Sequence, residues 1–339
     1  LLATASDDHT AAIWSVASGK QLLRMQHGAG VRSSIFSHDG RYLATSNRDN
    51  CVDVWDMGKQ RHLIELPHKG MIETVAFSSD SQCLVVSSDS SATIWEVASG
   101  RQLHILSHEK GVNSASFSPD GRYVATASSD STAAIWEVAS GRQLHVLLHK
   151  KTVNSASFSP DGRYVATASF DSTAAIWEVT SGHLLISLEH KNIVEAAAFS
   201  PDGYYLATAD INGNALLWEV TSGHQLYRLA HEEPVRDVIF SPDGQYLATI
   251  CDDNIVRVWK ISNGQQLTLL EHLNGVNAIA FSYDGRYLAT ACDDGAARIW
   301  ILWSEDLLAE ACARLTRNLT LEEWKQYLGD EPYRKTCSD

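Results

Sequence analysis

Histidine, aspartate and serine recur along this chain at fixed distances from tryptophan, and these residue types can together activate a nucleophile. An aspartate lies six positions before seven of the tryptophans, at Asp8, Asp49, Asp89, Asp130, Asp171, Asp253 and Asp294. A serine stands two positions before several of these aspartates, at Ser6, Ser87, Ser128 and Ser169. An Asp–His–Ser set can build a catalytic triad. A triad is needed only once, whereas this set recurs with a regular period, so we interpret its residues as a structural scaffold.

The same period organises the whole chain. Tryptophans at positions 14, 55, 95, 136, 177, 218, 259 and 300 are 40 or 41 residues apart, and histidines at 27, 68, 108, 149, 190, 231 and 272 follow the same spacing. In the unit that begins at His108, the strand-like segments GVNSASF, RYVATAS, TAAIW and RQLHVLL are separated by the turns SPDG, SDS and ASG. Four short antiparallel strands cannot bury both faces of their sheet alone, so copies must stack. Radial closure of the stack predicts an all-β fold, a β-propeller.

The repeated unit resembles the WD-repeat propeller family. The family's ending of the third strand appears as IWEV at 135–138 and 176–179 and as VWDM at 54–57. The histidine near the start of each unit stands where the family has a Gly-His pair, but the glycine is missing, as in the dipeptide SH at 107–108. The resemblance covers residues 1–301 and predicts one propeller domain there.

The two ends of the repeat array decide how the ring closes. The first unit lacks its inner strand, and the last unit, after Trp300, lacks an obvious outer strand. We expect the strand near 21–25 to join the sheet formed by 276–301, which gives seven blades. Residues 1–18 would then be the remnant of an upstream repeat. An eight-bladed ring is the alternative.

The resemblance also implies a role for the periodic polar residues. In the family they form a hydrogen-bond network from Asp to His to Ser to the indole N–H, which satisfies groups that burial would otherwise penalise. Complete sets are expected at His68/Ser87/Asp89/Trp95, His108/Ser128/Asp130/Trp136 and His149/Ser169/Asp171/Trp177. The pattern degrades at Asn47, Cys251, Cys292 and the pair Asp210 and Asn212, where we expect weaker networks.

Two near-identical stretches differ at one position, which points to a recognition surface. Residues 118–136 and 159–177 share their sequence except that Ser129 is replaced by Phe170. In WD-repeat propellers this position faces the rim where partners bind, and around the ring it holds Arg48, Ser88, Ser129, Phe170, Ile211, Asp252 and Asp293. A second ring, at the start of each inner strand, holds Arg32, Glu73, Asn113, Asn154, Glu195, Arg236 and Asn277. These positions vary while the scaffold is constant, and aromatic anchors beside polar rims are typical of binding hot spots. Drift between recent copies is the alternative.

Composition and charge narrow the classes of function. The net charge of −14 argues against a nucleic-acid partner, because phosphate binding needs clustered Lys and Arg. No apolar run approaches the roughly 20 residues that span a bilayer, so we expect no membrane association. Six cysteines lack metal-type spacing and are expected to be reduced, in a cytoplasmic protein: Cys51, Cys83, Cys251, Cys292, Cys312 and Cys337. We find no catalytic, metal or cofactor motif.

After Ile301 the repeat stops and a helical pattern begins. Residues 302–339 predict a two-helix tail, in which Ser304 caps the first helix and Thr320 with Glu323 forms a capping box for the second. The segment LTRNLTLEEWKQYLGDEPYRKTC resembles the ending of large bacterial, especially cyanobacterial, proteins that join a WD-repeat array to a signal-transduction NTPase of the STAND class. Related arrays are joined to caspase-like, TIR or kinase modules. The resemblance implies that an effector module of this kind precedes Leu1.

These observations predict a non-catalytic recognition propeller that binds protein partners, or a preceding module of its own chain, and controls an effector in a signalling or defence protein. A general scaffold for multiprotein assembly is an alternative. A propeller enzyme such as a lactonase or quinoprotein is a more remote alternative, because it needs an acid, metal or cofactor cluster at the channel mouth. Glu73 and Glu195 belong to the inner-strand ring but are separated by several blades.

Overall fold

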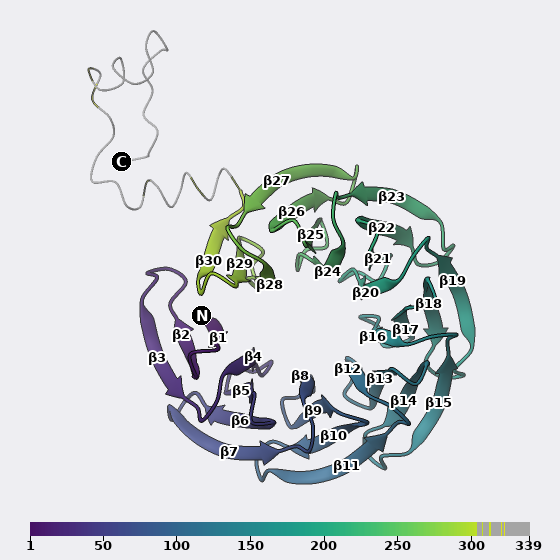
Figure 1. The fold of residues 1–339 in the computed structure, drawn as a ribbon, viewed down its shortest axis with the longest axis horizontal. Helices are drawn as coiled ribbons and strands as arrows, with labels where there is room; N and C mark the ends of the chain where they lie inside the picture. Colours follow the sequence, from purple (N-terminus) through teal and green to yellow (C-terminus); the bar gives the residue numbers. More distant parts are fainter. Residues whose placement is uncertain (304–306, 308–311, 313–319, 321, 323–339) are drawn as a thin grey trace.

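A computed structural model describes residues 1–303 and, beyond them, Leu307, Cys312, Thr320 and Glu322. Eight antiparallel sheets are arranged around a common axis in this part of the chain (Figure 1), and we number them as blades 1–8 in chain order. Six of the sheets have four strands, and blades 1 and 8 have three. The fold is an all-β propeller, as the sequence predicts.

The strands of the first four blades are as follows. Blade 1 contains β1 (Leu2–Ser6), β2 (Thr10–Trp14) and β3 (Gln21–Gln26). Blade 2 contains β4 (Val31–Phe36), β5 (Tyr42–Asn47), β6 (Cys51–Asp56) and β7 (Arg61–Pro67). Blade 3 contains β8 (Ile72–Phe77), β9 (Cys83–Ser88), β10 (Ser91–Glu96) and β11 (Arg101–Ser107). Blade 4 contains β12 (Val112–Phe117), β13 (Tyr123–Ser128), β14 (Thr132–Glu137) and β15 (Gln143–Leu148).

The second half of the ring repeats this arrangement. Blade 5 contains β16 (Val153–Phe158), β17 (Tyr164–Ser169), β18 (Thr173–Glu178) and β19 (Leu184–Glu189). Blade 6 contains β20 (Val194–Phe199), β21 (Tyr205–Asp210), β22 (Asn214–Glu219) and β23 (Gln225–Ala230). Blade 7 contains β24 (Val235–Phe240), β25 (Tyr246–Cys251), β26 (Ile255–Lys260) and β27 (Gln265–Glu271). Blade 8 contains β28 (Val276–Phe281), β29 (Tyr287–Cys292) and β30 (Ala297–Ile301).

The first strand of each four-stranded blade lies nearest the axis, and the fourth forms the outer wall (Figure 1). The second and third strands are made of small and β-branched residues that are buried on both faces, as in YVATAS of β13. The fourth strands alternate exposed and buried residues, as in QLHVLL of β15. Burial on both faces forces each of blades 2–7 to pack between two neighbours, whereas the strands β1 of blade 1 and β30 of blade 8 are only partly buried.

The core lies between adjacent blades rather than inside any one of them. Ile135 and Leu147 of blade 4 form one apolar cluster with Val153, Val165 and Trp177 of blade 5. Equivalent clusters recur around the ring. Because each cluster draws on two sheets, the position of every rim turn is fixed by the neighbouring blade as well as by its own.

The SPDG turns show how a short loop can connect the first and second strands of a blade. In blade 4 the Ser118 hydroxyl donates a hydrogen bond of 2.6 Å to Asp120 and accepts one of 2.9 Å from the Tyr123 amide. Gly121 has a φ of +70°, a conformation that glycine adopts at little cost. Each turn therefore reverses the chain within four residues.

The structure differs from the favoured seven-bladed closure. The strand Gln21–Gln26 pairs with β2, with Ala11 opposite Met25 and Ile13 opposite Leu23, and not with the sheet at 276–301. The tight turn from Ser15 to Lys20 explains this pairing, since a hairpin closes a much shorter loop than a strand brought in from the far end of the chain. Residues 1–18 contribute β1 and β2, so the ring has eight blades.

The chain that follows β30 is anchored to blades 7 and 8. The Trp303 ring stacks against Tyr246 with centroids 4.1 Å apart, and its indole N–H donates to the Gly285 carbonyl over 3.1 Å. Leu302 packs on the last apolar cluster. The two predicted helices of residues 302–339 lie outside the described residues. Within the described residues, no helix has the length and apolarity required to cross a membrane.

Candidate functional site

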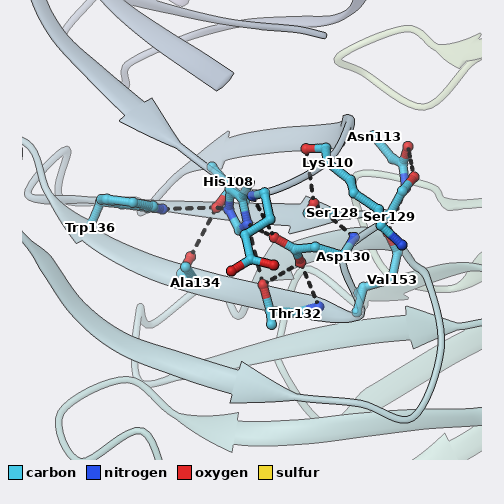
Figure 2. A network of polar contacts seen from close by, with 12 residues as sticks. His108, Lys110, Asn113, Ser128, Ser129, Asp130, Thr132, Ala134, Trp136 and Val153 are labelled. Atoms are coloured by element: carbon cyan, nitrogen blue, oxygen red, sulfur yellow. Dashed lines mark hydrogen bonds and ion pairs between the residues drawn. The ribbon is translucent and has the colours of Figure 1, made fainter. Parts of the chain in front are cut away.

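A buried polar network joins the rim turn of blade 4 to its indole (Figure 2). His108 Nδ1 lies 3.0 Å from Asp130 Oδ2, and His108 Nε2 lies 2.7 Å from Thr126 Oγ1. The Trp136 indole N–H donates to the same threonine oxygen over 2.8 Å. Ser128 does not join His108 to Trp136. It accepts a hydrogen bond from the Asp130 amide instead, so the predicted route through serine is wrong and Thr126 takes its place.

The threonine could have been found in the sequence. A threonine lies ten residues before seven of the tryptophans, and in each of these blades its hydroxyl accepts the indole N–H: Thr4, Thr45, Thr126, Thr167, Thr208, Thr249 and Thr290. In blades 4 and 5 the serine lies two positions after this threonine on the same strand, so both side chains lie on one face of the sheet. The resemblance to the family directed attention to the serine, although the threonine is at least as periodic.

Blade 5 repeats the network of blade 4. His149 Nδ1 lies 3.0 Å from Asp171 Oδ2, His149 Nε2 lies 2.8 Å from Thr167, and Trp177 donates to Thr167 over 2.9 Å. Ser169 accepts from the Asp171 amide. Burial acts to raise the pKa of Asp171, but hydrogen bonds from the residues around it outweigh that effect and lower the pKa to about 2. Burial lowers the pKa of His149. The acid is therefore held as a carboxylate that fixes the turn.

Blade 3 does not form the set expected at His68, Ser87, Asp89 and Trp95. Val86 lies opposite Thr93 as Thr126 lies opposite Ala134 in blade 4, so valine stands in place of the threonine, and the Trp95 indole donates directly to His68 Nε2 over 3.3 Å. His68, which follows β7, donates from Nδ1 to the Leu66 carbonyl, and burial lowers the pKa of this histidine. Asp89 is exposed with a φ of +47°, and Ser87 bonds Thr74 on the inner strand over 2.8 Å. The prediction of a complete network is wrong here because the loop between β9 and β10 is one residue shorter than the loop between β13 and β14, which displaces Asp89, and because valine supplies no hydroxyl.

Blade 2 moves the acid from the turn into the third strand. Asp53 lies between two imidazoles, with Oδ2 at 2.9 Å from His27 Nδ1 and Oδ1 at 2.8 Å from His62 Nε2. Asn47 adds a hydrogen bond of 3.2 Å to the same carboxylate. Burial opposes ionisation of Asp53, but the two histidines outweigh it and lower its pKa. The sequence contained a sign of this difference, because Asp53 stands where blades 4 and 5 have alanine.

Arginine replaces histidine as the partner of the turn aspartate in the last two blades. Arg257 lies 2.6 Å from Asp253, and Arg298 lies 2.6 Å from Asp294. His231 keeps its contact to Thr249 at 2.8 Å, but burial and the nearby Arg257 lower its pKa to about 4. In blade 6, Asp210 lies 3.2 Å from His190 and accepts hydrogen bonds from Asn214. The blades expected to be degraded therefore contain different polar pairs.

The two predicted rings of variable residues lie on one end of the propeller, which we call the rim. In six blades the residue of the first ring donates its amide to a carbonyl in the loop that leads into the inner strand: Arg48 to Gly30, Ser129 to Gly111, Phe170 to Thr152, Ile211 to Ile193, Asp252 to Pro234 and Asp293 to Gly275. Arg32, Arg48, Glu73, Arg236, Asp252, Asn277 and Asp293 are exposed. Asn113, Ser129, Asn154, Phe170, Glu195 and Ile211 are half-buried, and Ser88 is buried.

Part of the rim is occupied by contacts between blades. Asn113 donates to the Val153 carbonyl over 2.8 Å, which Figure 2 shows beside the network. Asn154 donates to Glu195 over 2.9 Å. Arg236 makes a bidentate contact with Asp252, with a shortest distance of 2.6 Å, and lies 3.7 Å from Glu195. Further around the ring, Arg48 pairs with Asp7 and Asn277 with Asp293. The contacts of Asn113, Asn154 and Arg48, and that of Arg236 with Glu195, join neighbouring blades, whereas Arg236–Asp252 and Asn277–Asp293 each lie within one blade. Phe170 and Ile211 have no polar side-chain role.

Comparison with known protein families identifies the same repeat. A profile of the family described as "WD domain, G-beta repeat" matches residues 19–56, 60–96, 100–137, 141–178, 182–219, 223–260 and 264–300. The chain belongs to the WD repeat family. Each WD repeat spans two blades, since the segment 100–137 contains β11 of blade 3 and β12–β14 of blade 4. Adjacent sheets are thus linked covalently within each repeat.

Other comparisons concern the fold. No curated protein matches the chain. A crystal structure of the computationally designed Ika8 protein aligns with a TM-score of 0.79 at 23% sequence identity, over 88% of this chain and 92% of Ika8. At that identity the similarity shows a shared fold and nothing about function.

The rim loops of the WD repeats also carry lysines that the sequence analysis did not single out. Lys110 precedes the inner strand of blade 4, Lys150 and Lys151 that of blade 5, and Lys191 that of blade 6. All four are exposed. The sequence contains no basic run longer than two residues here, and only the ring brings the three loops to one end of consecutive blades.

The described part of the WD repeat chain holds no group of three or more His, Cys, Asp or Glu side chains suited to a metal ion. Cys51, Cys83, Cys251 and Cys292 are free thiols, and burial raises the pKa of Cys51 to about 12. Cys312 is disulfide-bonded, so the expectation of reduced cysteines is wrong for that residue. Burial of its carboxyl group raises the pKa of Asp237, on the inner strand of blade 7, to about 6, although the residue as a whole is exposed.

Proposed function

We propose that the chain is a non-catalytic protein-interaction propeller whose rim recognises its partner. The observation that carries this proposal is Phe170. Blades 4 and 5 have the same backbone hydrogen bond at this position, 2.8 Å for Ser129 and 2.9 Å for Phe170, so the turn does not need an aromatic side chain. A half-buried aromatic residue with no task in the turn is a typical anchor for a protein partner.

The polar network supports the same conclusion. The periodic His, Asp, Thr and Trp side chains bond to one another inside the blades, which leaves substrate chemistry without a free nucleophile and base in them. Recognition is then left to the aperiodic residues of the rim. A rigid ring also limits the ordering entropy that association costs.

Site-specific cross-linking tests this proposal. A photoreactive phenylalanine analogue placed at Phe170 should form adducts with a defined protein in the native host. The same analogue at Tyr283, which is 99% exposed in the turn between β28 and β29 at the opposite end of the ring, is the matched control. Phe170→Asp should abolish adduct formation from neighbouring rim positions without lowering thermal stability. Equal adducts from both ends, or unchanged capture by Phe170→Asp, would refute the proposal.

We further propose that the propeller is the sensor part of a cytoplasmic bacterial signalling or defence protein and regulates an effector module. This finer role rests on the resemblance of the ending LTRNLTLEEWKQYLGDEPYRKTC alone, because the family profile and the similar structure cover only the propeller. The partner of the rim would then be a cellular cue or the effector module itself. Sequencing the gene upstream of the codon for Leu1 tests the idea, and the lack of any NTPase, protease-like, TIR or kinase module there would overturn it.

A general assembly scaffold is the second candidate, and one observation favours it. The outer strands expose apolar side chains on the circumference, including Ile105, Val146, Leu148, Leu184 and Leu185. A scaffold would use this wall as well as the rim. Cross-linkers at Leu148 and Phe170 that capture two different proteins in one complex would support scaffolding, and capture through the rim alone would support the sensor.

A further inference from the structure

The rim of blades 4–6 carries free positive charge although the chain has a net charge of −14. Lys110, Lys150, Lys151 and Lys191 are exposed in three consecutive loops. None of their ammonium groups forms an ion pair with any residue that the structure describes. On the other blades, Arg48 is paired with Asp7 and Arg236 with Asp252, whereas Lys69 of blade 3 and Arg32 of blade 2 are exposed and form no ion pair with a described residue. The loops of blades 4–6 therefore hold four unpaired cations of the described rim in consecutive positions.

The carboxylates beside these lysines are mostly engaged elsewhere. Asp171 accepts hydrogen bonds from His149, the Lys150 amide and Thr173, with distances from 2.6 to 3.0 Å. Glu195 accepts from Asn154 and lies 3.7 Å from Arg236. Glu109, next to Lys110, is the acid in these three loops that remains exposed. The loops therefore present a positive surface to solvent.

The centre of this surface is apolar. Phe170 bonds through its amide to Thr152, which directly follows Lys151, and Ile211 bonds to Ile193, which follows Lys191 by two positions. All four of these rim residues are half-buried rather than sealed. The lysines thus flank a pair of apolar residues on blades 5 and 6, the arrangement in which an apolar anchor is surrounded by charged contacts.

The neighbouring sector of the rim has the opposite sign. Glu232 and Glu233 occupy the loop into blade 7, and Asp293 stands at the turn of blade 8. All three are exposed, whereas the charge of Asp252 at the turn of blade 7 is paired with Arg236. This sector would repel a long polyanion such as a nucleic acid, which needs a continuous basic surface. A short acidic segment can occupy the lysines without reaching it.

We propose that the rim of blades 4–6 binds an extended acidic peptide that places one apolar side chain against Phe170 and Ile211. The lysines of the three loops pair with carboxylates on either side of that anchor. This inference rests on the proposed function and specifies the chemistry of the partner.

Fluorescence anisotropy with defined peptides tests the inference. The probe is a fluorescein-labelled peptide of Asp and Glu residues around a single leucine, and its partner probe has the same sequence with every acid replaced by its amide. The acidic probe should bind, the amide probe should not, and added salt should weaken binding because the contacts are exposed ion pairs. Lys150→Glu/Lys151→Glu should weaken binding roughly tenfold, since each exposed pair contributes up to about 1 kcal/mol.

One further variant tests the apolar anchor separately from the lysines, and a second controls for the change in net charge. Phe170→Ser copies the residue of blade 4. It should weaken binding of the acidic probe at low salt and at high salt. Lys20→Glu/Lys59→Glu makes the same change in net charge in turns at the opposite end of the ring and should leave binding unchanged. Equal binding of the two probes, or equal loss in the two double variants, would overturn the inference.

Two further outcomes would also overturn it. These are tighter binding of single-stranded DNA, or of vesicles of anionic phospholipid, to the same lysines. If the acidic probe fails while the cross-linker at Phe170 still captures a protein, the inference is wrong and the proposed function stands. If both fail, neither stands.

Discussion

The carboxylate of Asp171 offers the sharpest test of the scaffold, because blade 2 supplies its own control. Asp171 and Asp49 occupy the same position before their tryptophans. Asp171 accepts four hydrogen bonds, from His149, Lys150 and twice from Thr173, at 2.6 to 3.0 Å. The Asp49 side chain is exposed and makes no hydrogen bond with a described residue, because Asp53 has taken over its histidine. We expect Asp171→Asn to destabilise the protein and Asp49→Asn to leave it unchanged.

The size of the effect follows from the pKa. The Asp171 side chain is 6% exposed, and its pKa is about 2, against an ordinary value of 3.8. A difference of this size corresponds to about 2 kcal/mol of unfolding free energy at neutral pH. The asparagine also points an NH₂ group at the Lys150 amide or at His149, which leaves a buried donor unsatisfied and costs about 1–3 kcal/mol. The expected loss is therefore about 2–4 kcal/mol for Asp171→Asn and within about 0.5 kcal/mol of zero for Asp49→Asn.

Urea unfolding followed by tryptophan fluorescence measures both values, and hydrogen exchange resolved by blade locates them. For Asp171→Asn, the amides of β17 and β18 should exchange faster while those of blade 2 are unchanged. Equal losses from the two variants would show that the position matters rather than its hydrogen bonds. An unchanged midpoint for Asp171→Asn would refute the claim that the network stabilises the blade.

Three further predictions follow from the same structure. Acidification should destabilise the protein between about pH 6.5 and 4, because His231 is neutral when folded with a pKa of about 4 and takes up a proton when unfolded; urea midpoints that do not fall over this range would contradict it. Thr167→Val should cost about 1–3 kcal/mol, since it leaves the Trp177 indole N–H and His149 Nε2 without their shared oxygen, and urea midpoints measure the loss. Gly213→Ala should lower the melting temperature, because its φ is +74° and a Cβ would lie 2.5 Å from the His231 carbonyl oxygen; an unchanged melting curve would show that the loop can shift.

Much of the fold could be predicted from the sequence because its period encodes local structure. The spacing of Trp136 and Trp177 placed each third strand, and the turn residues placed the strands on either side. Every blade has the expected antiparallel order, and the variable positions lie together at one end of the ring. These features depend on residues that are close in sequence, so a single repeat unit is enough to predict them.

What could not be predicted depends on contacts between distant residues or on single exceptions to the repeat. The choice between seven and eight blades turned on whether β3 pairs with β2 or with β30, and the repeat is equally compatible with both. The polar cluster of blade 2 needed Asp53 and His62, which lie on neighbouring strands but belong to no repeating motif. The lysine loops became a surface only when the ring brought blades 4–6 side by side.

The near-identity of blades 4 and 5 has a consequence for how the ring assembles. Their first three strands are identical in sequence, VNSASF, YVATAS and TAAIWE, and they pair in the same register, with Val124 opposite Trp136 and Val165 opposite Trp177. During synthesis β12 could pair with β17 as well as with β13, and every cross-strand neighbour would be correct. Only the shorter loop favours the native partner, by an entropy that grows slowly with loop length. Such a mispaired chain would extrude one repeat and close a smaller ring, a kinetic trap that more divergent neighbouring blades avoid.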